Sequence, residues 1–293
     1  LKQSVSRTWL RYALLGLILA AVIIGNAAYE AGNIAGGILG LEALFGPGRE
    51  ALFSWIVGAA AFGLLWAGSY KLLEGVFTAL VLLMSLSFLL TAVLVRPAAA
   101  ELFYGLFVPG PDAQNIFTVM ALIGTTVVPY NLFLYPALVQ QRWKDPSHIG
   151  EMRRDIGYSI LIGGLVSMAI MVTAAGSGRT GLSGILDLTA SLEPIYGAAA
   201  RYAIGVGLLA AGITSAITAP LAAAYVAQQS FGWKAGNSFW KFRLVWIGVL
   251  LFGILSLSLD FRPLEIIFFA QVANALLLPL IAVMLWWMAG SEA

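Results

Sequence analysis

The apolar stretch from Ile116 to Gln140 contains, at its centre, residues that are unusual inside a helix. The letters GTTVVPYN occupy positions 124–131, so a glycine, two hydroxyls, a proline, a phenol and an amide fall together. Pro129 has no N–H to donate and its ring clashes with the preceding turn, which frees backbone carbonyls near Thr125 and Thr126. Hydroxyl, amide and carbonyl oxygens are the ligands that hard cations prefer.

These oxygens predict a helix that is unwound over residues 124–130 and a substrate or cation site that includes Thr125, Thr126 and Asn131. Discontinuous helices of this kind form ion sites in secondary transporters, because freed carbonyls are tolerated in a membrane where they are buried in protein or line a wet cavity. The alternative is a proline kink whose polar neighbours only satisfy the backbone and the neighbouring helices.

A second polar group lies near the start of the chain, where Asn26, Glu30 and Asn33 follow one another at intervals of four and three residues. This spacing places them on one face of a helix. A carboxylate in the middle of a span costs about 2.5–3.5 kcal/mol even on insertion scales, so Glu30 should face the protein interior and be paired, hydrated or protonated. Glu30 is therefore a candidate proton carrier, and interhelical hydrogen bonds are the alternative role for the two asparagines.

A third polar pair, Gln271 and Asn274, lies one helical turn apart in the last apolar stretch. A carboxamide oxygen is a reasonable ligand for a hard cation. Carboxamides also form hydrogen bonds between spanning helices, which is the more ordinary role for such residues.

The helices that position these residues must cross a membrane. Eight segments reach the length of about 20 mostly apolar residues that a spanning helix needs, and their apolar runs are continuous rather than alternating, which favours helices over a barrel. We therefore predict an all-α polytopic membrane protein with a single transmembrane domain over residues 1–293. The eight spans run approximately over Tyr12–Leu44, Ala51–Ala67, Leu72–Val95, Ile116–Gln140, Ile156–Gly176, Ala199–Ala227, Phe242–Leu259 and Leu264–Met288.

The composition supports the same class of protein. The 293 residues are 60% hydrophobic and 10% charged, with a mean hydropathy of +0.91, whereas a soluble domain is about 25% charged. The absence of cysteine excludes thiol chemistry, and the single histidine, His148, argues against multi-histidine metal catalysis or a Ser-His-Asp triad. A net charge of +2 gives no indication of a nucleic-acid partner. Membrane lipid is the expected surrounding, and no enzymatic activity is indicated.

Basic residues are distributed unevenly between the two sides of the membrane. Eleven of the sixteen fall on the side of both chain ends and five on the other side, which predicts cytoplasmic ends in a bacterial inner membrane. Because the chain begins with leucine and shows no signal peptide, we expect it to be a piece of a longer protein. The stretches 142–155 and 177–194 are candidates for short amphipathic helices along the interface.

The sequence GTTVVPYNLFLYPALVQQRW resembles the sixth helix of the NRAMP (natural resistance-associated macrophage protein) divalent-metal transporters. The stretches KLLEGVFTALVLLMSLSFLL, GLLAAGITSAITA and AQVANALLLPL follow in the family's order with similar spacing. The resemblance covers nearly the whole chain and implies the five-plus-five inverted-repeat fold of amino acid/polyamine/organocation-type transporters. It places the chain at family helices three to ten, so the two N-terminal helices, the first of which carries an Asp-Pro-Gly-Asn metal motif, are expected as a missing part of the same protein.

The resemblance also marks positions at which this chain departs from the family. The alanine carbonyl and the methionine sulfur of the family's metal site match Thr125 and Val128. Two histidines of the sixth helix match Tyr130 and Tyr135, and tyrosine does not titrate near neutral pH as histidine does. The glutamine of the tenth helix is retained as Gln271.

In the third family helix, Glu30 stands where the family has an aspartate and Asn33 where it has a glutamate, and Ala224 replaces an eighth-helix glutamine. Glu30, Asn33 and Tyr130 are thus the remaining candidates for proton coupling. Because proton relays normally use several titratable groups, uncoupled or weakly coupled transport is expected.

The resemblance implies a secondary transporter that moves a divalent cation by alternating access around Thr125, Asn131 and Gln271. Because Val128 offers no sulfur ligand, manganese or magnesium should be favoured over softer ions. The cation is the substrate, protons are the candidate coupled ion, and no cofactor is expected. Two alternatives are the same fold carrying a small organic solute, bound through a carboxylate at a half-helix N-terminus, and a non-transporting fragment or sensor.

Overall fold

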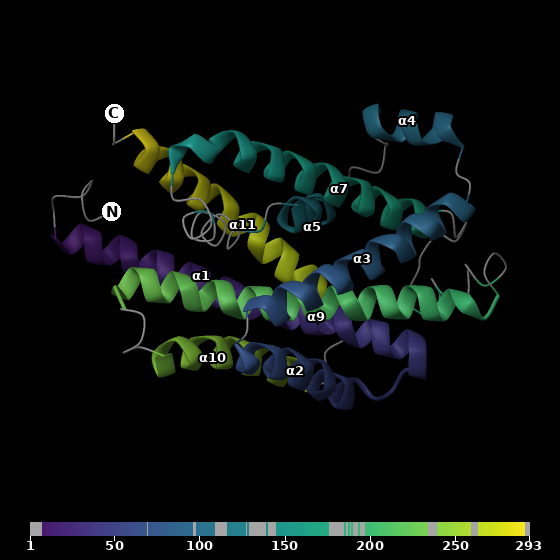
Figure 1. The fold of residues 1–293 in the computed structure, drawn as a ribbon, viewed down its shortest axis with the longest axis horizontal. Coiled ribbons are helices and arrows are strands. Elements are labelled where there is room, and N and C mark those ends of the chain that lie inside the picture. Colours follow the sequence, from purple (N-terminus) through teal and green to yellow (C-terminus); the bar gives the residue numbers. More distant parts are fainter. Residues whose placement is uncertain are drawn as a thin grey trace. The chain divides into compact units, whose positions relative to one another are not determined.

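The structure, a computed structural model (Figure 1), describes residues 8–68, 70–95, 98–108, 116–126, 128, 139, 145–175, 185, 187, 189, 193, 197–233, 239–258 and 263–290. All regular elements within these ranges are helices, as the continuous apolar runs predict. They are α1 (Thr8–Phe45), α2 (Glu50–Ala67), α3 (Tyr70–Val95), α4 (Ala99–Phe107), α5 (Ile116–Thr126), the 3-10 helix η1 (Pro146–His148), α7 (Ile149–Ala175), α9 (Ala199–Phe231), α10 (Phe239–Leu257) and α11 (Pro263–Gly290).

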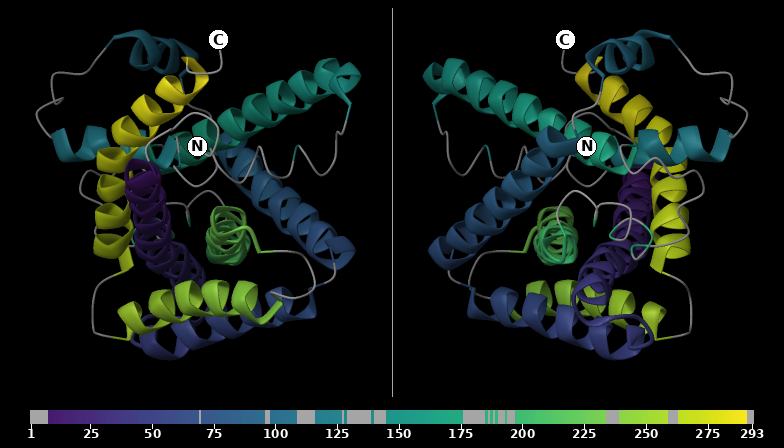
Figure 2. Two further views of the ribbon diagram at one scale, coloured as in Figure 1. Left: turned by 90° about the vertical axis from the view of Figure 1, so that its left-hand side faces the viewer. Right: turned by 90° about the vertical axis from the view of Figure 1, so that its right-hand side faces the viewer.

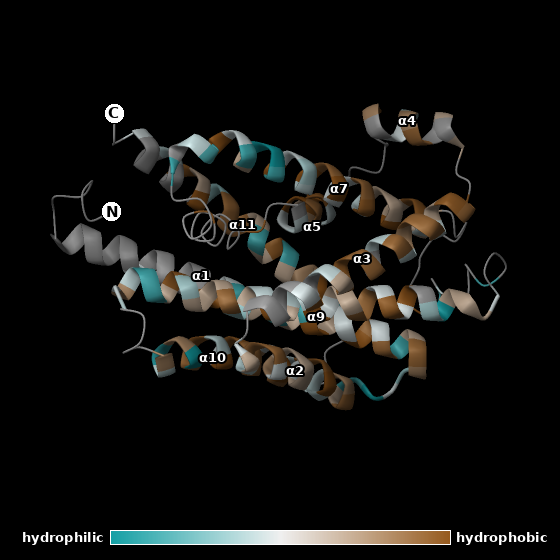
Figure 3. Ribbon diagram, in the orientation of Figure 1, coloured by the Kyte–Doolittle hydropathy of each residue, from teal (hydrophilic) through white to brown (hydrophobic). Residues whose placement is uncertain are grey.

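Six segments in the described part of the chain are long and apolar enough to cross a membrane. Two of the eight predicted spans are not among them: α1, which is 38 residues long, and α5, whose apolar part covers only Ile116–Thr125. Apolar residues dominate α3 and most of α11, and a short hydrophilic band interrupts α11 partway along its length (Figure 3). The six are Glu50–Ala67, Thr78–Val95, Ile149–Ala175, Ala199–Phe231, Phe239–Leu257 and Pro263–Val283.

The chain forms two compact units. The first unit comprises Leu1–Asn33, Asn115–Leu138 and Ser215–Ala293, and the second comprises Ile34–Gln114 and Val139–Thr214. In the first unit α5 packs against α11, and α11 also runs beside α1 (Figure 2). Glycines permit this approach: a Cβ at Gly25 would lie 3.1 Å from Leu277 Cδ1, and one at Gly32 would lie 3.4 Å from Ala270 Cβ.

Close contacts between helices also hold the second unit together. There α3 packs against α7 and α2, and the last turns of α1 contact the first turns of α9. A Cβ at Gly40 would collide with the backbone of Leu209 and Gly205, and one at Gly205 would collide with the side chain of Leu44. Small residues therefore set the spacing of α1 and α9, as is usual for helices in membranes.

We expect Gly40→Ala to destabilise the protein and Gly36→Ala to leave it unchanged or more stable. The methyl group at 40 would meet α9 backbone, which cannot move aside, whereas nothing lies within 4 Å of a Cβ at 36. Overpacking costs about 1–3 kcal/mol, while alanine is favoured over glycine in a helix by about 0.5–1 kcal/mol. Thermal melting in detergent tests this pair, and equal melting temperatures for the two variants would contradict the packing described.

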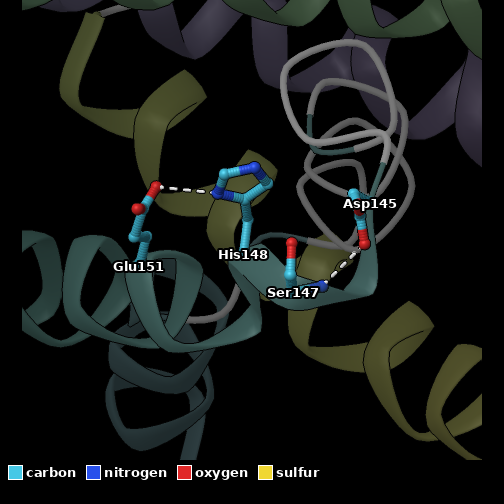
Figure 4. A network of polar contacts seen from close by, with 4 residues as sticks. All are labelled: Asp145, Ser147, His148 and Glu151. Carbon is cyan, nitrogen blue, oxygen red and sulfur yellow. Dashed lines mark hydrogen bonds and ion pairs between the residues drawn. The ribbon is translucent and has the colours of Figure 1, made fainter.

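The start of α7 differs from the prediction for the basic stretch 142–155. No separate amphipathic helix occupies its described part: η1 leads directly into α7, which continues unbroken to Ala175. Asp145 Oδ1 accepts a hydrogen bond from the Ser147 N–H at 3.0 Å, and His148 Nδ1 lies 3.2 Å from Glu151 Oε2 (Figure 4). The aspartate satisfies a backbone donor at the helix start, and the contact of His148 with Glu151 is local, three residues along the chain.

A short helix that the sequence analysis did not anticipate, α4, occupies part of the stretch after α3. Its nine residues are too few to span a bilayer. Phe103, Tyr104 and Phe107 are all largely exposed, an arrangement typical of a helix that lies in the membrane interface. The other stretch considered for such a helix, 177–194, lies outside the described residues except at positions 185, 187, 189 and 193.

Candidate functional site

The helix that carries the predicted break ends early. α5 runs from Ile116 to Thr126, and Val128 is not helical. The helix therefore stops two residues after Gly124, where unwinding was predicted to begin. Residues 129–138 lie outside the described residues.

The end of α5 is packed tightly against α11. A Cβ at Gly124 would collide with the carbonyl group of Gln271 and approach the backbone N of Ala275. Only glycine allows the two backbones to lie this close. The glycine thus brings the last turn of α5, with Thr125, to the part of α11 that carries Gln271.

A hydrogen-bonded group joins α1, α5 and α11 within the first unit. The Gln271 Nε2 amide donates to the Tyr29 hydroxyl at 3.2 Å, and Tyr29 shares a further hydrogen bond with the Thr125 side chain. Tyr29 is buried and packs with Ala219 and Ala222 of α9. Sequence reasoning identified Gln271 and Thr125 and missed Tyr29, whose position one residue before Glu30 was the available signal.

Glu30 is completely buried, at 0% exposure. The Asn33 Nδ2 amide donates to Glu30 Oε2 at 3.1 Å and to the backbone carbonyl of Ser215 in α9 at 3.1 Å. Asn33 therefore fixes one carboxyl oxygen of Glu30 and also ties α1 to α9. The interhelical hydrogen bond considered for Asn33 is therefore present, together with a contact to Glu30.

Several buried polar atoms of the first unit have no hydrogen-bond partner among the described residues. They are Asn26 Nδ2, Glu30 Oε1, Gln271 Oε1 and Asn274 Nδ2; one such atom, Thr173 Oγ1, lies in the second unit. Because more than about 90% of buried polar groups in proteins are satisfied, these atoms are candidates for contacts with water or with a ligand. The two oxygens are acceptors, and rotating either asparagine amide would present an oxygen instead of the nitrogen.

The donor set of this region is made of oxygens. Within the described part of the chain, no group of three or more His, Cys, Asp or Glu side chains could hold a metal ion. The described candidates are instead carboxamides and hydroxyls, from Gln271, Asn274, Thr125 and Tyr29. Such ligands suit a hard cation and offer little to a soft one.

Among the other positions named from the sequence, the structure describes the side chains of some but not of others. Val128 is partly buried and packs against the cluster of Tyr29, Ala219 and Ala222, and Ala224 is fully buried in α9. The side chain of Thr126, and the whole of Tyr130, Asn131 and Tyr135, lie outside the described residues.

Comparison with known proteins decides the family. The family described as "Nramp: Natural resistance-associated macrophage protein-like" matches residues 1–293, the whole chain. The chain belongs to the Nramp family. The resemblance to this family that the sequence analysis described is thus confirmed.

Curated relatives that the Nramp chain matches are named divalent metal cation transporter MntH. The protein of Chromohalobacter salexigens is 31% identical over 215 residues, which are 69% of this chain and 50% of that protein. Those of Aeromonas hydrophila and Caldanaerobacter subterraneus are 29% identical over 199 residues and 27% identical over 266 residues. These matches cover 65% and 86% of this chain and 48% and 62% of the relatives, so the chain spans about half the length of the curated relatives it matches.

Proposed function

We propose that this Nramp protein is a secondary transporter that moves a divalent cation across the membrane by alternating access. The observation that carries the proposal is the hydrogen-bonded group of Tyr29, Gln271 and Thr125 at the end of a short helix, in a family whose curated relatives are named divalent metal cation transporters. An interrupted helix with oxygen ligands on its neighbours is the usual form of an ion site in such transporters. The names of the relatives give no support to an organic solute or to an enzyme.

We further propose eight spans in a single transmembrane domain with the five-plus-five inverted-repeat arrangement. α5 has 11 described residues and so rises about 16 Å, roughly half of the hydrocarbon thickness. This is the length expected of one half of a broken span. α1, with 38 residues, is longer than a span requires, and these two helices with the six long apolar segments account for eight.

The proposed cation site includes Thr125, Thr126, Asn131, Gln271 and Asn274. Gln271 Oε1 is buried and has no partner among the described residues, which leaves an oxygen that can bind a cation. The backbone carbonyls that Pro129 is expected to free near Thr125 and Thr126 would add further oxygens. Val128 contributes only apolar contacts, so manganese or magnesium should be preferred over cadmium.

The proposed setting is a bacterial inner membrane with both chain ends in the cytoplasm. The distribution of basic residues supports the cytoplasmic position of the ends. The experiment that tests the function is uptake of Mn²⁺ or Mg²⁺ into vesicles containing the full-length protein, with protein-free vesicles as the control. Cation uptake above the control supports the proposal. Uptake of a small amino acid without any divalent cation flux would overturn it.

Proton coupling in these vesicles should be weak or absent, because Glu30 is the only buried acid described in the first unit and Tyr130 is a poor proton carrier. With a pH dye inside the vesicles, cation entry should cause little acidification. Glu30→Gln keeps an oxygen that accepts from Asn33, so we expect its cation flux to be retained. Acidification that follows cation entry in the wild type and disappears in Glu30→Gln would instead assign Glu30 the carrier role, with Asn33 as its partner.

A further inference from the structure

Glu30 is a buried acid that the proposed divalent-cation site does not include. Its Oε2 oxygen accepts the hydrogen bond from Asn33, whereas its Oε1 oxygen has no partner among the described residues. Within the described part of the chain, no lysine, arginine or histidine forms an ion pair with Glu30. Because a buried charge is normally paired or bound to a metal ion, a charged Glu30 requires a cation from outside the protein.

A second unpartnered polar group lies on the same face of α1. Asn26 is one turn before Glu30 and is 2% exposed, and its Nδ2 atom has no partner among the described residues. Residues four apart in a helix are neighbours on its surface. Rotation of the Asn26 amide presents its oxygen in place of its nitrogen. Asn26 can therefore supply a neutral oxygen ligand next to the carboxyl group of Glu30.

The buried side chains of α9 at the level of Glu30 are apolar. This level is fixed by Asn33, whose Nδ2 amide lies 3.1 Å from both Glu30 Oε2 and the Ser215 carbonyl oxygen. Tyr29, the neighbour of Glu30, packs on the alanines of the next turns of α9. The fully buried side chains of these turns are Ala216, Ile217, Ala219, Ala222 and Ala223. The fully buried face of α9 can therefore contribute oxygens only from its backbone.

Pro220 leaves one backbone oxygen of α9 without a helical partner. Pro220 lies inside the helix and has no N–H, so the carbonyl of Ala216, four residues earlier, receives no hydrogen bond from it. Ala216 directly follows Ser215, to which Asn33 binds. The freed carbonyl thus belongs to the turn of α9 that Asn33 links to the Glu30 carboxyl group. Freed helix carbonyls of this kind coordinate sodium ions in membrane transporters.

The charge of this group of ligands selects a monovalent ion. One carboxylate neutralises one positive charge, whereas a divalent ion bound here would leave a positive charge without a partner inside the membrane. Dense packing also favours a small ion, because Glu30, Ala216 and Ala219 are all fully buried. The alternative to a bound ion is a Glu30 that carries a proton and is neutral.

We propose that Glu30 binds a sodium ion between α1 and α9, with the Ala216 carbonyl and the Asn26 amide oxygen as neutral ligands. All three residues belong to the first unit. The ion reinforces the link that Asn33 makes between the two helices. The divalent-cation site lies instead where α5 meets α11, so sodium binding at Glu30 does not require that the protein transport a divalent cation.

Thermal melting of the full-length protein in detergent, at constant pH and without divalent ions, tests this proposal. NaCl should raise the melting temperature of the wild type by about 2–4 °C above that in choline chloride of the same concentration, because an ion that binds only the folded state stabilises it. Glu30→Gln keeps an oxygen for Asn33 but has no charge, so it should melt at the same temperature in both salts. Equal melting of the wild type in the two salts, or an unchanged shift in Glu30→Gln, would overturn the proposal.

Glu42→Gln is the matched control, because Glu42 is the other buried acid among the described residues and belongs to the second unit. This variant should keep the wild-type shift. A loss as large as that of Glu30→Gln would show a general effect of buried charge and would contradict a specific site. Pro220→Ala supplies an N–H for the Ala216 carbonyl and should reduce the shift; a full shift in this variant would contradict the assigned ligands.

Infrared spectroscopy of the wild type distinguishes a sodium ion from a proton and does not depend on the folding of any variant. When choline chloride replaces NaCl at constant pH, the sodium ion leaves and Glu30 takes up a proton from the solvent, because an isolated buried carboxylate is unstable. The difference spectrum between the two salts should therefore show a gain of the C=O stretching band of a neutral carboxyl group. A difference spectrum without this band would contradict the proposal.

Discussion

Replacing Gln271 by leucine is expected to lower the flux of Mn²⁺ or Mg²⁺ into vesicles by about 10- to 100-fold, the loss typical of removing a group that holds a metal. Leucine has about the same side-chain volume as glutamine, but it has neither the oxygen nor the nitrogen of the carboxamide. Its Oε1 oxygen, buried without a partner among the described residues, is the proposed cation ligand. Its Nε2 amide is the donor to Tyr29.

Tyr29→Phe separates the contribution of the Gln271 oxygen as a ligand from that of the hydrogen bond between Gln271 and Tyr29. Phenylalanine keeps the ring that packs on Ala219 and Ala222 but cannot accept the hydrogen bond from Gln271. The net contribution of one hydrogen bond is about 0.5–1.5 kcal/mol, so its loss predicts a decrease in flux of only about 2- to 10-fold. Equal losses in Tyr29→Phe and Gln271→Leu would mean that Gln271 acts by positioning the helices and not as a ligand. Wild-type flux in Gln271→Leu would remove it from the site.

Val128→Met is expected to raise the affinity for Cd²⁺ relative to Mn²⁺ by about tenfold, which corresponds to about 1.4 kcal/mol. A thioether is a soft ligand, and Val128 follows the last turn of α5 directly, where it packs beside Tyr29. Calorimetric titration of the full-length protein with each ion measures the ratio.

Val128→Leu is the control for this substitution, because leucine adds volume at the same position without sulfur. Its ratio of cadmium to manganese affinity should remain that of the wild type. A rise of the same size in both variants would show that volume rather than sulfur changes the site. A strong preference of the wild type for cadmium would contradict the assignment of an oxygen-based site.

Polar residues that lie within apolar stretches could be recognised from the sequence as candidates for buried contacts. Glu30, Asn33 and Gln271 stand out in apolar stretches, and the structure shows each of them in a hydrogen bond between side chains. The interruption of the fourth span was predictable for the same reason, because Pro129 cannot continue a helix. α5 ends at Thr126, three residues before it.

Features that depend on contacts between helices were not predictable. Tyr29 is an ordinary residue in a spanning helix until α11 brings Gln271 to its hydroxyl. Gly124 was assigned to the unwound segment, whereas it still belongs to α5 and allows α11 to approach. α4 was missed because its nine residues are too few to produce a strong periodic pattern. Thr126, Tyr130 and Asn131 remain predictions of the sequence.

The most direct test of the central claim is to locate the cation. Crystals of the full-length protein soaked in Mn²⁺ would show it by anomalous scattering. We predict a single strong peak within about 2.5 Å of Gln271 Oε1 and of oxygens at the end of α5, the distance at which such ions bind oxygen ligands. A peak bound elsewhere, with none beside Gln271 in a protein that carries manganese into vesicles, would contradict the site proposed here.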